Sequence, residues 1–153
     1  MDISFEFFPP SSNKAETVLW ESIKILEPLK PNFVSVTYGA GGTTRERTHN
    51  CVKKIIDETN LEPAAHLTCV NSTKDEIKEI TDSYKKIGVK HIVALRGDMQ
   101  NFEDFEPHPR GYKSSIDLVK NLSQQDFNVT VSAYPEKHPD ALSFDEDIEF
   151  LKR

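Results

Sequence analysis

The sequence predicts an α/β fold made of about the first five βα units of a (β/α)8 TIM-type barrel, hence an incomplete barrel. Short apolar runs recur roughly every 30 residues, as expected of βαβ units. Segments with helical periodicity lie between the runs, and polar residues stand at the C-terminal end of each run. This alternation is typical of a parallel sheet joined by right-handed crossovers.

The five expected strands are short runs rich in β-branched and aromatic residues. They are "SFEFF" (4–8), "FVSVT" (33–37), "AAHLT" (64–68), "HIVAL" (91–95) and "VTVSAY" (129–134). The first run places Glu6 among phenylalanines and stops at Pro9 and Pro10. The pattern alone assigns the phenylalanines to the core. Glu6 is then either the solvated residue of an edge strand or an acid whose proton is used.

A helical period follows each expected strand. The apolar positions are Leu19, Ile23 and Leu26 in the first helix; Cys51, Val52, Ile55 and Ile56 in the second; Ile77, Ile80, Tyr84 and Ile87 in the third; Ile116, Val119 and Leu122 in the fourth; and Ile148 and Leu151 in the fifth. The capping box Thr73-x-x-Glu76 opens the third helix, and Gly88 follows its end. We expect Ser114 or Ser115 to cap the fourth helix and Ser143 to cap the fifth.

Five βα units also suit a doubly wound sheet of the flavodoxin type, so the strand ends must distinguish the two folds. A doubly wound sheet concentrates its site at one switch point, whereas a barrel gathers residues from all strand ends around one mouth. Here every strand end is polar: Glu6, Thr37-Tyr38, His66 with Thr68, Arg96-Gly97-Asp98 and Tyr134-Pro135-Glu136. This favours the barrel. A complete barrel needs about 250 residues, so three of its units are missing from these 153 residues.

The composition is that of an ordinary soluble protein, with 37% hydrophobic and 29% charged residues. The net charge of −6 offers no electrostatic attraction for nucleic acid or an anionic membrane. No apolar run approaches the roughly 18 residues of a membrane span, and no secretory signal is visible at the N-terminus. Cys51 and Cys69 fit neither a disulfide framework nor a CxxC motif, and the histidines lack the spacing of a metal site. We therefore expect a cytoplasmic protein without a metal, nucleic-acid or membrane partner.

Two strand-end motifs indicate ligand binding. "YGAGGTTRERT" (38–48) combines three glycines with a following helix, a geometry that exposes N–H groups to an anion or another ligand, although it is neither GxGxxG nor a P-loop. "ALRGD" (94–98) ends a strand with a cation, a glycine and an acid. Gly97 permits the close approach of a flat ligand. Glu6 and Asp98 are carboxylates that we expect at neighbouring strand ends, with pKa values driven apart by their surroundings.

Five stretches in order resemble the methylenetetrahydrofolate reductase family: "SFEFFPP", "FVSVTYGAGGTTRERT", "AAHLTC", "HIVALRGD" and "SAYPEKHPDA". The resemblance implies that residues 1–153 are the N-terminal part of a single FAD-binding (β/α)8 barrel domain. It also implies a flavoenzyme in which NADH or NADPH reduces FAD. 5,10-Methylenetetrahydrofolate is then reduced to 5-methyltetrahydrofolate, which supplies methyl groups for methionine synthesis. The implied partners are these small molecules and, in the full-length protein, further copies of the chain in a homo-oligomer.

The resemblance also implies roles for individual residues. Glu6 corresponds to the general acid that protonates N10 of the folate, and we expect Phe5, Phe7 and Phe8 to enclose it and disfavour its charged form. Asp98 corresponds to an aspartate that tunes the flavin and positions the folate. The implied cofactor-binding residues are Thr37, Tyr38, Ala40, His66, Arg96, Gly97, Asp98, Ser115, Tyr134, His138 and Asp147. The other two hypotheses are an inactive truncated fragment and a non-catalytic module of the flavodoxin type.

Overall fold

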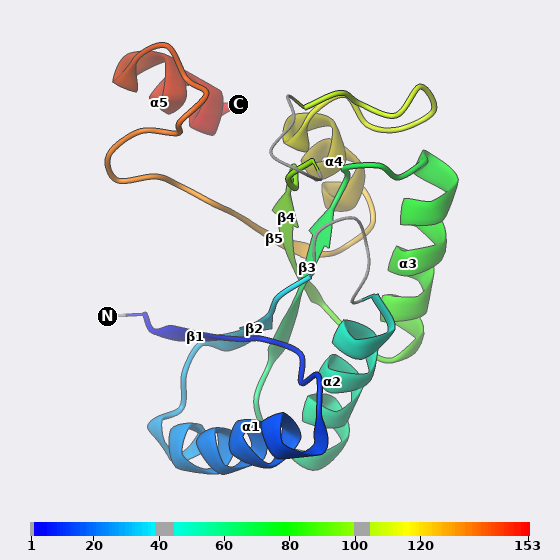
Figure 1. Cartoon of the computed structure of the whole chain (residues 1–153), viewed down its shortest axis with the longest axis vertical. Coiled ribbons are helices and arrows are strands. Elements are labelled where there is room, and N and C mark those ends of the chain that lie inside the picture. Colours follow the sequence, from blue (N-terminus) through cyan, green and yellow to red (C-terminus); the bar gives the residue numbers. More distant parts are fainter. Residues whose placement is uncertain (1, 39–44, 100–104) are drawn as a thin grey trace.

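The protein forms one five-stranded parallel sheet in a computed structural model that describes residues 2–38, 45–99 and 105–153. The strands are β1 (Ser4–Phe7), β2 (Phe33–Val36), β3 (Pro63–Thr68), β4 (His91–Leu95) and β5 (Asn128–Val131). Their spatial order is β1-β2-β3-β4-β5, and every neighbouring pair is parallel (Figure 1). All five predicted strands are therefore present. The predicted fifth strand was too long, because β5 ends at Val131 and residues 132–134 lie beyond it.

The strand order decides between the two folds that the sequence left open. A flavodoxin-type sheet has the order 2-1-3-4-5, in which the first strand lies between the second and the third. Here β1 lies at one edge and pairs with β2, while β5 lies at the opposite edge and pairs with β4. Sequential order is the arrangement of neighbouring strands in a (β/α)8 barrel. The fold is therefore α/β of the barrel type, and its five strands form an incomplete barrel.

Helices follow the strands in regular alternation. They are α1 (Asn13–Leu26) with the short 3-10 helix η1 (Glu27–Leu29), α2 (Arg45–Glu58), α3 (Lys74–Lys86), α4 (Ser115–Ser123) and α5 (Phe144–Lys152). The capping box of α3 is confirmed: Thr73 Oγ1 accepts from the Glu76 amide, and the Glu76 carboxylate accepts from the Thr73 amide. Ser114, not Ser115, caps α4, and Ser143 caps α5.

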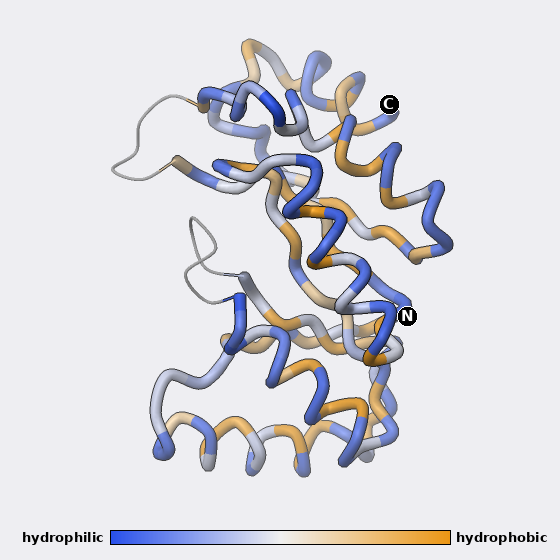
Figure 2. The backbone as a smooth tube through the Cα atoms, turned by 90° about the vertical axis from the view of Figure 1, so that its right-hand side faces the viewer, coloured by the Kyte–Doolittle hydropathy of each residue, from blue (hydrophilic) through white to orange (hydrophobic). Residues whose placement is uncertain are grey.

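The core lies between the sheet and the helices α1 to α4. On β1 and β2, alternate residues point toward the helices, where Phe7, Val34 and Val36 join Leu19 and Ile23 of α1 in one cluster. Strand β3 is buried along its whole length. Figure 2 shows the corresponding pattern, with hydrophobic colour along the strands and alternating colours along the helices. None of the helices in the described ranges is long and apolar enough to cross a membrane.

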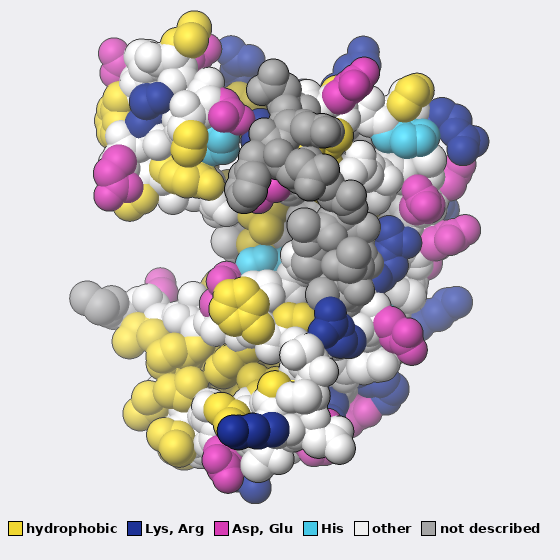
Figure 3. Space-filling view, viewed as in Figure 1, with side chains coloured by type: hydrophobic (Ala, Val, Ile, Leu, Met, Phe, Trp, Pro, Cys, Tyr) yellow, Lys and Arg dark blue, Asp and Glu magenta, His cyan; other side chains and the backbone are white. Residues whose placement is uncertain are grey.

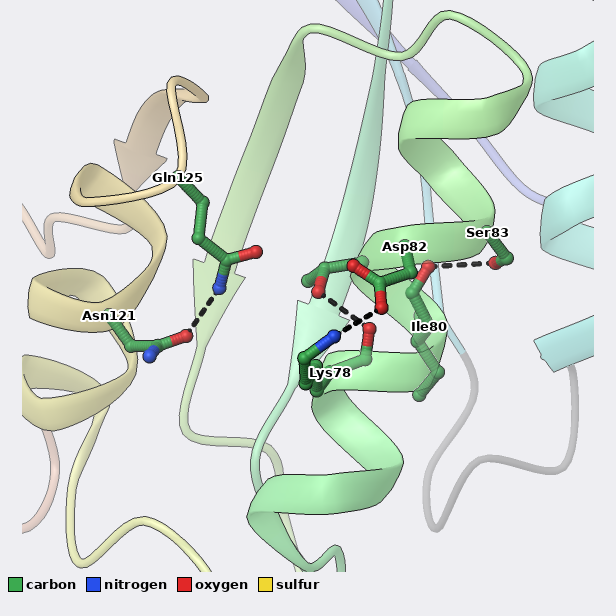
Figure 4. A network of polar contacts seen from close by, with 7 residues as sticks. Lys78, Ile80, Asp82, Ser83, Asn121 and Gln125 are labelled. Carbon is green, nitrogen blue, oxygen red and sulfur yellow. Dashed lines mark hydrogen bonds and ion pairs between the residues drawn. The ribbon is translucent and has the colours of Figure 1, made fainter.

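The outer helix surfaces carry local polar contacts, as expected of solvated faces. On α3, Lys78 pairs with Asp82 one turn later, and Ser83 Oγ donates to the Ile80 carbonyl (Figure 4). Beside α4, the side chain of Gln125 donates to that of Asn121 over 2.6 Å. Contacts between residues three or four apart support single helices by only a few tenths of a kcal/mol. Packing against the sheet therefore contributes most of the stability of α3 and α4.

Two apolar areas of the surface stay uncovered by the described chain. One includes Ile3, Phe8, Val18, Ile25 and Leu29, around β1 and α1, and the other includes Leu142, Phe144, Phe150 and Leu151, in and before α5. Figure 3 shows yellow side chains gathered over β1 and α1, with a hollow between this part and the part formed by α5. In Figure 1, α5 stands apart from the other helices at the end of an extended segment.

Candidate functional site

The C-terminal ends of the parallel strands meet at one edge of the sheet and hold most of the predicted site residues. The largest concentration lines a pocket of about 580 Å³ between the ends of β4 and β5, the start of α4, and the β5–α5 connection with α5. This volume lies within the range of small-molecule sites. Seven of the eleven predicted cofactor-binding residues line it: Arg96, Gly97, Asp98, Ser115, Tyr134, His138 and Asp147.

Arg96 is the best anchored cation of this pocket. It follows the last residue of β4, and its carbonyl accepts from the amide of Val70 over 2.9 Å. Its Nη1 lies 2.8 Å from Oδ2 of Asp140, and its guanidinium carbon lies 5.1 Å from the ring centroid of Phe105. The position of Arg96 directly after a strand allows its side chain to point outward or toward the site. The structure places it on the pocket wall, with its carboxylate partner in the β5–α5 connection.

Gly97 has a structural role beside the one that the sequence suggested. Its φ of +82° lies in the region that side chains disfavour, and an added Cβ would lie 2.6 Å from Cγ1 of Val70 and 2.8 Å from Cβ of Thr68. The close approach to Gly97 is therefore made by the β3–α3 turn on one side, while the pocket lies on another. Glycine is required here to bring the end of β4 against the end of β3.

The β5–α5 connection is held by hydrogen bonds within itself and to the first turn of α5. The amide of His138 donates to Oδ2 of Asp147 over 2.8 Å, and the amide of Asp140 donates to Nδ1 of His138 over 3.1 Å. The ring of Tyr134 packs edge-on against the imidazole of His138, with centroids 4.8 Å apart. Three predicted residues thus lie together at the pocket. The carboxylate of Asp147 is occupied with ordering the connection.

A second group of site residues lies at the ends of β1 and β3. Glu6 pairs in register with Ser35, and Ser35 pairs with Ala64, so these residues and His66 share one face of the sheet. Across β2, Nε2 of His66 lies 3.3 Å from Oε2 of Glu6. The contact lacks hydrogen-bond geometry, and Nε2 is buried without a hydrogen-bond partner among the described residues. Burial lowers the pKa of His66, against the smaller opposite effect of Glu6, so the imidazole is neutral at pH 7.

Two expectations about Glu6 are wrong. Its carboxylate side chain is 55% exposed, and the phenylalanines do not enclose it. Neighbouring residues of a strand point to opposite faces, so Phe5 and Phe7 lie on the helix side, while Phe8 follows the strand and is 77% exposed. Glu6 and Asp98 also do not stand at neighbouring strand ends, because β2 and β3 separate β1 from β4.

Of the three predicted cofactor-binding residues that follow β2, the structure describes Thr37 and Tyr38. The amide of Thr37 donates to the Phe7 carbonyl, and the Thr37 carbonyl accepts from Oγ1 of Thr48 in α2. The hydroxyl of Tyr38 accepts from Nε of Arg45 over 2.7 Å. These contacts join the end of β2 to the start of α2, away from the pocket lining. Ala40 lies outside the described residues.

Sequence reasoning missed Asp140 and Phe105, whose side chains contact the Arg96 guanidinium. Asp140 stands in the quoted stretch "SAYPEKHPDA", but nothing in its local pattern indicates a partner 44 residues earlier. Cys69, in contrast, is close to Arg96 without being reactive. Burial raises the pKa of its thiol to about 11, so it remains protonated at pH 7.

The fold and the pocket together define a barrel-type α/β protein with a candidate ligand site at the C-terminal ends of its strands. The profile of the family described as methylenetetrahydrofolate reductase matches residues 1–153. The chain belongs to the methylenetetrahydrofolate reductase family.

Similarity to individual proteins agrees with this assignment. The chain is 49% identical over 154 residues to the 5,10-methylenetetrahydrofolate reductase of Escherichia coli (strain K12) and 46% identical over 153 residues to that of Pectobacterium carotovorum subsp. carotovorum. These alignments cover 100% and 99% of the chain and 50% of each relative. It is 31% identical to methylenetetrahydrofolate reductase (NADH) 1 of Zea mays, over 98% of the chain and 28% of that protein. The chain thus spans about half the length of its bacterial relatives.

Proposed function

We propose that this chain is the N-terminal part of a single barrel domain that binds FAD and reduces 5,10-methylenetetrahydrofolate to 5-methyltetrahydrofolate with NAD(P)H. The observation that carries the proposal is the pocket at the ends of β4 and β5, where seven of the residues implied by the family resemblance meet. In the cell we expect a cytoplasmic enzyme that supplies methyl groups for methionine synthesis and works as a homo-oligomer.

The residues of the pocket suit a flavin nucleotide. Apolar walls from the β4 end, α4 and α5 surround the polar groups, as in most cofactor sites. Arg96 supplies N–H donors for an anionic group. His138 accepts at Nδ1, so its Nε2 carries a proton and offers another donor. We propose that Arg96, His138 and Tyr134 hold the FAD, whose chemistry when bound is to accept and return a hydride.

Glu6 is the proposed general acid for the folate. Opening the five-membered ring of the substrate requires a proton on N10, and Glu6 is a carboxyl group at the same mouth of the sheet. His66 lies 3.3 Å away and is neutral at pH 7, so the pair is not an ion pair of opposite charges. The exposure of Glu6 allows its proton to be replaced from solvent between turnovers.

The first experiment asks whether the intact protein binds FAD and which reactions it supports. Stoichiometric FAD with menadione reduction by NAD(P)H is the expected result, and it contradicts both an inactive remnant and a module that binds without catalysis. A protein that takes up no flavin contradicts the proposed function. The sequential strand order already argues against the flavodoxin-type alternative.

The substitution Glu6→Gln separates the two half-reactions. We expect flavin reduction by NAD(P)H to persist and folate reduction to fall by at least about 100-fold, the usual contribution of a general acid. Stopped-flow absorbance of the flavin measures the two half-reactions separately. Glu21→Gln, which removes a similar charge from the exposed side of α1, serves as the control and should leave both rates unchanged. Survival of both half-reactions in Glu6→Gln contradicts the role of Glu6.

A further inference from the structure

Asp140 connects three residues that the family resemblance assigns to cofactor binding, although it is not itself one of them. Its carboxylate pairs with Arg96 over 2.8 Å, and its amide donates to Nδ1 of His138 over 3.1 Å. The amide of His138 in turn donates to the carboxylate of Asp147 over 2.8 Å. A continuous chain of polar contacts therefore runs from the end of β4 to the first turn of α5, along the wall of the pocket.

The backbone of Arg96 is fixed, but its side chain needs further support. The Arg96 carbonyl is held by the β3–α3 turn, and Gly97 packs against Val70 and Thr68, so the strand end cannot shift easily. The guanidinium lies beyond these contacts, on a side chain that is 32% exposed. A free arginine side chain loses rotamer entropy when a ligand orders it, and this loss weakens binding. Asp140 on its edge and Phe105 against its face limit that freedom before any ligand arrives.

We propose that Asp140 is a positioning residue for the flavin nucleotide: its carboxylate holds the Arg96 guanidinium, and its backbone amide sets the His138 tautomer, so that both present N–H donors to the pocket. This inference rests on the proposed function. An arginine has five N–H donors, and Nη1 uses one of them toward Asp140. Within residues 2–38, 45–99 and 105–153 the other donors of Arg96 have no hydrogen-bond acceptor, so they can serve an anionic ligand. The bond between Asp140 and Arg96 also ties the β5–α5 connection to the end of β4. The pocket wall formed by the β5–α5 connection is thereby joined to the wall formed by the end of β4.

Because Asp140 is negatively charged, positioning and long-range electrostatics predict opposite changes in FAD affinity when its charge is removed. Asp140 is an acid beside a pocket proposed for an anionic cofactor. Removing its charge should tighten FAD binding if only long-range electrostatics matter. Positioning predicts the opposite. For Asp140→Asn we expect the Kd of FAD to rise about tenfold, the effect typical of a lost charge-assisted hydrogen bond. Asp140→Glu keeps a carboxylate within reach of Arg96 and should restore most of the affinity.

The experiment is a titration of the intact apoprotein with FAD, followed by flavin fluorescence, for the wild type, Asp140→Asn, Asp140→Glu and Glu136→Gln. Glu136 is an exposed acid of the same connection, so Glu136→Gln removes the same charge and should leave the Kd unchanged or slightly lower. The melting temperature of each apoprotein is measured in parallel. Exposed ion pairs contribute little to stability, so we expect Asp140→Asn to melt close to the wild type.

Each result has one meaning. Weaker binding in Asp140→Asn, with an unchanged melting temperature and recovery in Asp140→Glu, supports positioning. Unchanged or tighter binding in Asp140→Asn overturns it, and so does a loss of affinity accompanied by a large drop in the melting temperature, which identifies a purely structural role. If the wild type itself binds no FAD, the proposed function fails first, and the inference falls with it.

Discussion

At the scale of single residues, the backbone of Gly97 determines how closely the ends of β3 and β4 approach. For Gly97→Ala we expect a loss of about 2–4 kcal/mol in the free energy of unfolding, because a positive φ and the contacts with Val70 and Thr68 both oppose a methyl group. Urea denaturation measures the loss.

Gly88→Ala is the matched control for Gly97→Ala. Gly88 has a φ of +88°, but its added Cβ would meet no atom within 4 Å. We therefore expect a smaller loss, about 1–2 kcal/mol, from the backbone conformation alone. The difference between the two variants measures the steric contribution at the site. Equal losses would show that close packing at Gly97 does not matter.

At the scale of elements, the same kind of N-cap should have different effects on two helices. Thr73 caps α3, which buries Ile77, Ile80, Thr81 and Tyr84, whereas Ser143 caps α5, which buries none of its residues. We expect Thr73→Ala to lower the free energy of unfolding by about 1 kcal/mol, the usual value for a lost cap. Fraying of α3 would expose part of the core.

For Ser143→Ala we expect little change in global stability, since α5 can fray without exposing buried residues of its own. Denaturant unfolding followed by circular dichroism compares the two cap variants. Equal destabilisation by both would mean that α5 unfolds together with the sheet. In that case α5 contributes more to the stability of the fold than the exposure of its residues indicates.

At the scale of the whole molecule, two buried histidines make stability depend on pH. Burial lowers the pKa of both His66 and His91 in the folded state, against smaller opposite effects of Glu6 and Glu62. The unfolded chain then binds more protons than the folded one below a pH of about 6.5, the usual histidine pKa. Above that pH both imidazoles are neutral in the folded and the unfolded chain, so the fold keeps its full stability. Stability falls as the pH drops below it, because the unfolded chain takes up protons more readily.

His66→Gln should reduce this acid sensitivity, and His66→Gln combined with His91→Gln should reduce it further. Thermal melts between pH 5 and pH 8 provide the measurement, with the slope of stability against pH as the readout. The variants need not match the wild type at pH 8, because only the slope carries the information. A slope identical in all three proteins would contradict the contribution of the buried imidazoles.

Much of the fold follows from local patterns in the sequence. Alternating apolar runs and helical periods predicted all five strands and five helices, and Thr73 with Glu76 predicted the start of α3. The ends were less predictable. Pro9 stops the first strand region, but Phe8 before it is already outside β1, and Ser132 to Tyr134 continue the apolar pattern of β5 without pairing. Pairing depends on the neighbouring strand, which the local sequence does not describe.

Local sequence is enough to specify the βα rhythm, the helix caps and the polar strand ends, because these depend on residues close together in the chain. The strand order comes from tertiary packing, and with it come the separation of Glu6 from Asp98 and the contact of Glu6 with His66 across β2. Tertiary packing also decides that Asp140 meets Arg96 from 44 residues away. Such contacts arise from the packing of whole elements, so no local pattern encodes them.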